Sequence, residues 1–218
     1  MYTRHLVRRV LSRLARDLFF RSMNNEAAYD ILRRTAEVLH AQGAQWWLTD
    51  GTLLGFVRDD GFLGHDTDVD LGIMISDYSP DLEAALERAG LQIYDRYGTP
   101  DNGLQITVRS RWLYLPGTSL DLFFFYDDET SDTRWHAAYF RGTQFRYRYP
   151  RFDLGTLTHR GETYAIPSPP EDFLVAKYGE GWRTPDPSWH NMLSPRCLDL
   201  SHLPPEQQES IRSRRGTL

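Results

Sequence analysis

Residues 50–72, with the sequence DGTLLGFVRDDGFLGHDTDVDLG, decide the fold of this chain. At their end, Asp68 and Asp70 alternate with Val69 and Leu71, which is the pattern of a half-buried β-strand. Side chains two residues apart on a strand point to the same face, about 6–7 Å apart at their Cα atoms. Two carboxylates this close repel each other unless a cation lies between them. The strand therefore predicts a site for a hard divalent cation, Mg2+ or Mn2+.

The residues before this strand predict a binding site for phosphates. Asp50, Gly51 and Thr52 form a predicted turn before a short helix, where free backbone N–H groups and the Thr52 hydroxyl face a ligand. Arg58 at the end of that helix is a candidate clamp for a phosphate oxygen. Asp66 lies at the end of the following loop, where it is a candidate metal ligand or a contact to one.

A further acidic residue, Asp121, lies within the most apolar predicted strand, residues 119–126. One interpretation places its carboxylate in solvent at a sheet edge. The other makes it a third carboxylate beside Asp68 and Asp70, where it binds metal and orients or deprotonates an attacking hydroxyl. An unpaired carboxylate in so apolar a strand is costly, so we predict the second arrangement.

The remaining pattern predicts an α/β (α+β) protein. Periodicity and turn residues mark these elements: a helix from Asn24 or Asn25 to Gly43, strands at 46–48, 91–97, 104–108 and 112–115, a helix opened by Ser79-Pro80, extended structure over 134–166, and a helix at 171–178. From Pro185 onward Pro and Ser accumulate, which predicts a loosely ordered tail with a short helix near 206–212. We assign residues 1–22 to an N-terminal helix, 23–190 to one domain and 191–218 to a Pro/Ser-rich tail.

Composition excludes several classes of protein. The formal charge of −5 argues against a broad nucleic-acid-binding surface, so no nucleic-acid partner is expected. One cysteine, Cys197, rules out a disulfide framework within the chain and suits a reducing compartment. No run of 18 apolar residues occurs, so no membrane-spanning helix is expected.

Residues 1–21 form a predicted basic amphipathic helix, with six arginines and a single acidic residue. It is either docked on the body of the protein or bound to an anionic membrane surface. We expect a cytoplasmic protein, with peripheral contact to the inner face of the membrane as the open alternative.

The quoted motif resembles the signature of the LicD and fukutin family. Trp47-Leu-Thr-Asp-Gly-Thr-Leu-Leu-Gly-x-x-Arg58 and His65-Asp-Thr-Asp-Val-Asp-Leu-Gly72 carry the resemblance, and Lys177-Tyr178-Gly179 is similar to its C-terminal element. The resemblance implies a nucleotidyltransferase-like mixed β-sheet flanked by helices. It implies transfer of a phospho-alcohol from a CDP-activated donor to a cell-surface glycan, with release of CMP. The family's metal-binding aspartates fall on Asp68 and Asp70, with Asp66 preceding them, and its later strand aspartate falls on Asp121.

Three alternatives stay open at this stage. Lys177 either contacts the leaving phosphate or is an exposed surface lysine. Several aromatic residues either stack on a sugar or choline group or lie in the core: Trp135, Tyr139, Phe140, Phe145, Tyr147 and Tyr149. The function itself could also be transfer of NMP from an NTP, or metal and nucleotide binding without catalysis.

Overall fold

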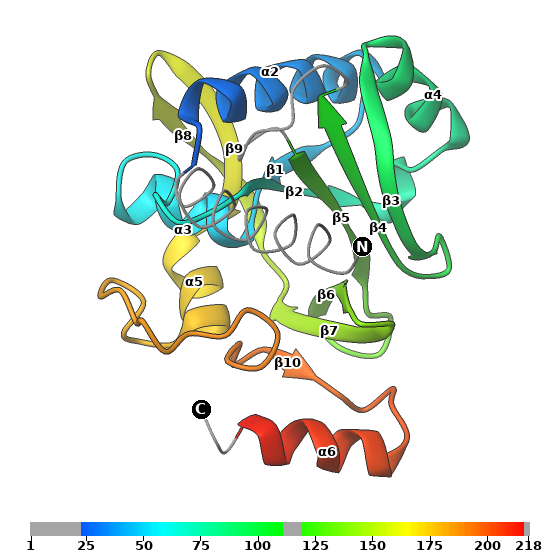
Figure 1. Cartoon of the computed structure of the whole chain (residues 1–218), viewed down its shortest axis with the longest axis vertical. Coiled ribbons are helices and arrows are strands. Elements are labelled where there is room, and N and C mark those ends of the chain that lie inside the picture. The colour runs from blue at the N-terminus through cyan, green and yellow to red at the C-terminus, as the bar shows by residue number, and fades with distance from the viewer. Residues whose placement is uncertain (1–22, 111–118, 216–218) are drawn as a thin grey trace, which may run out of the picture.

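The computed structural model describes residues 23–110 and 119–215. The predicted N-terminal helix and the predicted strand at 112–115 lie outside these residues. Figure 1 shows a twisted mixed sheet with helices packed against it, so the predicted class, a mixed sheet flanked by helices, is confirmed. No helix within the described ranges has both the length and the apolarity that crossing a membrane requires.

The eight-stranded sheet has the order β1-β2-β5-β6-β7-β10, and β4, which also pairs with β3, joins it at β5. The strands are β1 (Trp46–Leu48), β2 (Asp68–Met74), β3 (Leu91–Thr99), β4 (Asn102–Ser110), β5 (Ser119–Asp127), β6 (Thr133–Phe140), β7 (Thr143–Pro150) and β10 (Leu198–Asp199). β2 and β5 run parallel, whereas the other pairs of this sheet are antiparallel. Since β5 has β2 on one side and β4 on the other, the edge-strand interpretation of Asp121 is wrong.

Two helices cover one face of the sheet, as Figure 1 shows. They are α2 (Asn25–Ala41), whose N-cap is the Asn24 side chain, and α4 (Pro80–Arg88), which has proline in its first turn; η1 (Ile75–Asp77) lies between β2 and α4. The apolar residues that alternate with the acids, Val69 and Leu71, are fully buried, as predicted. By strand alternation, the acidic side chains project from the opposite face.

That opposite face carries a second set of elements. They are α3 (Asp50–Arg58), the hairpin of β8 (Asp153–His159) and β9 (Glu162–Ser168), and α5 (Pro170–Tyr178). Trp47 packs edge-on against Phe125, and Phe152 and Phe173 extend this aromatic cluster. Gly72 leaves room for Trp47, because a Cβ atom there would lie 2.4 Å from the indole ring.

The C-terminal segment has more order than its composition predicts. β10 pairs with β7, and the Arg148 backbone amide donates to the Cys197 carbonyl at 2.8 Å. Arg148 also forms ion pairs with Asp128 and Asp199. The predicted short helix is α6 (Pro205–Arg215) and is longer than expected. Pairing with a strand far away in the chain orders this segment, and local composition does not show that pairing.

Candidate metal centre

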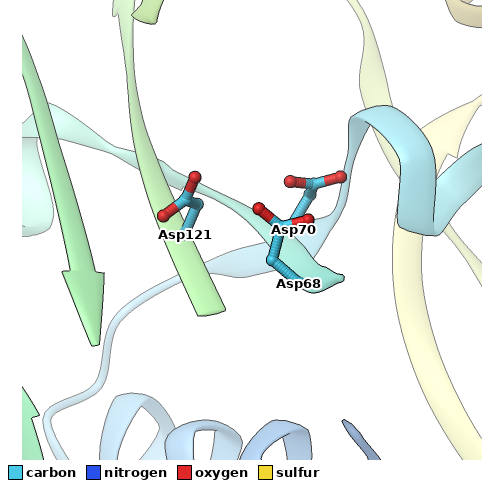
Figure 2. Close-up of side chains that lie close together, drawn as sticks. All are labelled: Asp68, Asp70 and Asp121. Carbon is cyan, nitrogen blue, oxygen red and sulfur yellow. The ribbon is translucent and has the colours of Figure 1, made fainter. Parts of the chain in front are cut away.

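Three carboxylates meet where β2 and β5 run side by side. The parallel register places Asp70 opposite Asp121, and Asp68 opposite Ser119. Figure 2 shows all three acids projecting to one side of the two strands. One carboxylate oxygen from each of Asp68, Asp70 and Asp121 lies within 4.8 Å of the others. The predicted cluster is therefore present in the geometry.

The electrostatics of these three residues fit a cation site. Burial holds the pKa of Asp70 well above its usual range, and the charges of neighbouring acids, Asp68 first, raise it further. The same two causes, burial and then Asp68, raise the pKa of Asp121 to about 7. Carboxylate oxygens are the hard ligands that Mg2+ and Mn2+ prefer, and a cation among them removes the repulsion that raises these pKa values.

The first turn of α3 holds Asp70 in place. The backbone amides of Gly51 and Thr52 donate to Oδ2 of Asp70, at 2.9 and 3.3 Å. The Asp70 amide donates to the Thr52 hydroxyl at 2.9 Å. The helix begins at Asp50 rather than after Thr52, and the N–H groups predicted to face phosphates are directed at this carboxylate.

Glycine at position 51 is required by the approach of two carboxylates. A Cβ atom there would lie 2.8 Å from Oδ2 of Asp66 and 3.1 Å from Oδ2 of Asp70. Asp66 therefore lies beside the centre, although it is not part of the three-carboxylate group. Burial first and the charge of Asp68 second raise the pKa of Asp66 to about 7.

Arg58 is bound within the protein. Its guanidinium donates to both carboxylate oxygens of Asp59, at 2.8 and 3.0 Å, and to the Trp182 carbonyl at 3.3 Å. Its positive charge still acts on the centre, because it lowers the pKa of Asp66 against the larger effects of burial and Asp68.

Lys177 is buried, with 6% of the residue exposed, and forms an ion pair with Asp50. The surface-lysine alternative is therefore wrong. The signal that sequence reasoning lacked is tertiary: α5 packs against α3 and β7, which encloses the lysine.

Sequence reasoning also missed residues that support the centre. Gln105 donates from Nε2 to Asp121 at 3.0 Å, and the Thr107 hydroxyl donates to the other oxygen of that carboxylate. Both residues alternate with buried Leu104, Ile106 and Val108, so two polar residues on one face of a predicted strand were the available signal. His136 and Tyr149 lie near Asp50; no local pattern marked His136, and Tyr149 was considered only as an aromatic residue.

The six aromatic candidates differ in how deeply they are buried. Phe145, Tyr147 and Tyr149 are buried in the core, whereas Phe140 is an exposed residue. Trp135 and Tyr139 are partly exposed, and Trp135 stacks on Tyr126 while Tyr139 stacks on Tyr97. Core packing thus accounts for three of these rings.

The carboxylates project from two adjacent parallel strands of a mixed sheet, next to the first turn of a short helix. This is the arrangement expected for a nucleotidyltransferase domain. Residues 43–168 match the family model described as LicD/FKTN/FKRP, nucleotidyltransferase domain. The chain belongs to this family. The matched range contains Asp50, Asp66, Asp68, Asp70 and Asp121, whereas Lys177 follows it.

Several curated proteins are similar to this chain. Ribitol-5-phosphate transferase FKTN of Mus musculus is 32% identical over 170 residues, which cover 77% of this chain and 36% of that protein. The Homo sapiens protein of the same name is 30% identical over 172 residues, covering 78% and 36%. An uncharacterized protein of Caenorhabditis elegans is 28% identical over 148 residues, covering 65% and 38%. The chain thus spans little more than a third of the length of these relatives.

Two solved structures show a weaker likeness. The lincosamide antibiotic adenylyltransferase LnuA superposes with a TM-score of 0.46 at 13% identity, over 70% of this chain and 85% of that chain. The antibiotic-resistance factor ANT(2'')-Ia superposes with a TM-score of 0.48 at 14% identity, over 88% and 93%.

Proposed function

We propose that this chain transfers a phospho-alcohol, such as ribitol phosphate or phosphocholine, from a CDP-activated donor to a hydroxyl of a cell-surface glycan, with release of CMP. The observation that carries this proposal is the cluster of Asp68, Asp70 and Asp121 in a domain of the LicD family. Relatives that bear the name ribitol-5-phosphate transferase support the choice of a phospho-alcohol.

Asp68, Asp70 and Asp121 would hold Mg2+ or Mn2+, with Asp66 as a further ligand or a contact to one. Their three oxygens fit such an ion in kind and in spacing. A bound divalent cation supplies charge neutralisation for the pyrophosphate of the donor.

The reaction is an in-line displacement at the phosphorus distal to the nucleoside. The acceptor oxygen forms a bond to that phosphorus, and the bond from phosphorus to the bridging oxygen breaks, so CMP leaves with the electron pair. Asp121 accepts the proton of the attacking hydroxyl. Gln105 and Thr107 fix the orientation of its carboxylate, which favours a positioned base.

The donor phosphates would lie along the first turn of α3, beside Gly51 and Thr52, with Arg58 supplying positive charge. Support comes from the position of that turn against Asp70 and from the effect of Arg58 on the pKa of Asp66. Asp50 and Lys177, the other candidate contacts to the donor, form an ion pair with each other.

A thermal-shift screen tests the choice of donor. CDP-ribitol, CDP-glycerol, CDP-choline and NTPs are each added with and without Mg2+, since a ligand that binds the folded state raises its apparent stability. A shift that needs both Mg2+ and one CDP-alcohol, followed by CMP release from that donor, supports the proposal. Pyrophosphate release from an NTP indicates NMP transfer instead, and binding without turnover indicates a non-catalytic domain.

Asp70→Asn is the control for this assay, because it removes one carboxylate charge and keeps the shape of the side chain. The variant should lose turnover. Unchanged turnover in Asp70→Asn, or turnover that is the same with and without divalent ions, contradicts a metal-dependent transferase.

A further inference from the structure

A buried ion pair lies next to the candidate metal centre, because one of its members, Asp50, immediately precedes Gly51, which donates to Asp70. Lys177 and Asp50 keep 8% and 10% of their side chains exposed, and they contact each other. The Tyr149 hydroxyl donates to Asp50 at 3.4 Å, and Nε2 of His136 lies 3.7 Å from its other oxygen. Two charges removed from water in this way need each other, since either one alone would be an uncompensated buried charge.

The charge of Asp50 is kept by this pairing. Burial alone would raise the pKa of Asp50, but the charge of Lys177 lowers it below the usual range. The buried His136 ring stays neutral, because burial lowers its pKa to about 4. Lys177 is therefore the cation that pairs with Asp50 among the described residues.

Asp50 adopts an unusual backbone conformation at the start of α3. Its φ of 48° lies in the left-handed region, which residues with a side chain rarely adopt. Such a conformation persists only where surrounding contacts hold it, and the contacts here are those of the carboxylate with Lys177 and Tyr149.

The two residues after Asp50 are those that hold Asp70. The amides of Gly51 and Thr52 donate to Oδ2 of Asp70, so the backbone angle at Asp50 sets the direction of both donors. A continuous path of contacts thus runs from Lys177 on α5, through Asp50 on α3, to a carboxylate of the centre on β2.

We infer that Lys177 and Asp50 form a positioning pair, which fixes the first turn of α3 so that Asp70 presents its carboxylate to the metal ion. Neither residue is a catalytic residue. The inference rests on the metal centre of the proposed function and assigns this buried pair a role other than donor binding. Residues that orient a metal ligand in this way typically change metal affinity by about 10- to 100-fold.

The test measures Mn2+ affinity by isothermal titration calorimetry, without any nucleotide. The variants are Lys177→Met, Asp50→Asn and the double variant. We expect each folded variant to bind Mn2+ at least about tenfold more weakly than the unaltered protein. The double variant is decisive, because it contains no unpaired buried charge at this pair and should therefore fold even if Lys177→Met alone fails to fold.

A matched control is Arg148→Met. It removes two partly buried ion pairs, with Asp128 and with Asp199, where β10 pairs with β7. Its Mn2+ affinity should stay within about twofold of the unaltered protein, because Asp128 and Asp199, the ion-pair partners of Arg148, lie outside both α3 and the metal centre. A folded double variant with unchanged Mn2+ affinity overturns the inference.

A second measurement needs no metal. Hydrogen exchange of the peptide that contains Gly51 and Thr52 should be faster in the double variant. The ion pair no longer holds the first turn of α3 there, so the hydrogen bonds of the two amides to Asp70 open more often. Unchanged exchange there also overturns the inference. If the unaltered protein binds Mn2+ but transfers no phospho-alcohol, and the variants bind Mn2+ more weakly, the proposed function fails and the inference stands, so the two failures are distinguishable.

Discussion

Replacing Asp121 by Asn should have opposite effects on stability and on metal binding. Asn keeps the shape of the side chain and retains partners for Gln105 and Thr107, one as acceptor and one as donor. It removes one of three negative charges whose ligand oxygens lie within 4.8 Å of one another. The variant should therefore be more stable than the unaltered protein without metal, and should lose most of the stabilisation by Mg2+.

The charge repulsion and the pKa shift give magnitudes of the same order. Two unit charges no more than 4.8 Å apart, at an effective dielectric constant of about 20, repel by about 3 kcal/mol or more. A rise in the pKa of Asp121 from 3.8 to about 7 corresponds to about 4 kcal/mol of lost stability above pH 7. Weaker hydrogen bonds to a neutral amide cost about 1 kcal/mol, so a net gain of about 2–3 kcal/mol is expected at pH 8.

The sign of the pH dependence is fixed by the direction of the shift. The folded state retains the Asp121 proton between pH 3.8 and about 7, so the unaltered, metal-free protein loses stability as the pH rises through that window. Urea unfolding at pH 4 and pH 8, with and without Mg2+, measures the effect. The gain in the Asn variant should be small at pH 4 and full at pH 8.

Asp132→Asn is the matched control, because its carboxylate is 91% exposed and lies outside the centre. Its pH dependence and its response to Mg2+ should equal those of the unaltered protein. An Asp121→Asn protein that is less stable than the unaltered one at pH 8 without metal, or that gains as much from Mg2+, would refute the reasoning.

Three further expectations test other parts of the molecule. Gly72→Ala should destabilise the fold by about 1–3 kcal/mol through contact of the new methyl group with Trp47, whereas Gly64→Ala, where nothing lies within 4 Å, should be close to neutral in chemical denaturation. Burial lowers the pKa of His136 from 6.5 to about 4, so its contribution to stability is present above pH 6.5 and is lost on acidification towards pH 4, by about 3 kcal/mol. In His136→Gln the free energy of unfolding should fall less between pH 6.5 and pH 4, and an unchanged fall would contradict a buried, neutral His136. Membrane contact through residues 1–21 predicts binding of the full chain to vesicles with anionic lipid, weakened by salt and by replacing the arginines of that segment with glutamine; the docked-helix alternative predicts no vesicle binding.

Much of the site was predictable because its strongest signals are local. The alternation of Asp68 and Asp70 with apolar residues defines one acidic face, and β2 buries Val69 and Leu71 as predicted. The need for glycine at position 51 was also predictable, although the groups that approach it are the carboxylates of Asp66 and Asp70. Asp121 was found because a charge in an apolar strand is costly, and the register of β5 against β2 explains how it joins the pair.

The sequence by itself determined which side chains share a face, among them the acidic pair of Asp68 and Asp70, and where α2 and α4 begin, because side-chain periodicity and helix capping act over a few residues. Only the tertiary structure decided that Asp121 lies inside the sheet, that Lys177 is buried against Asp50, and that the C-terminal segment adds a strand to β7. Those contacts join residues far apart in the chain. Their formation depends on how whole elements pack, and no local pattern of residue types encodes that.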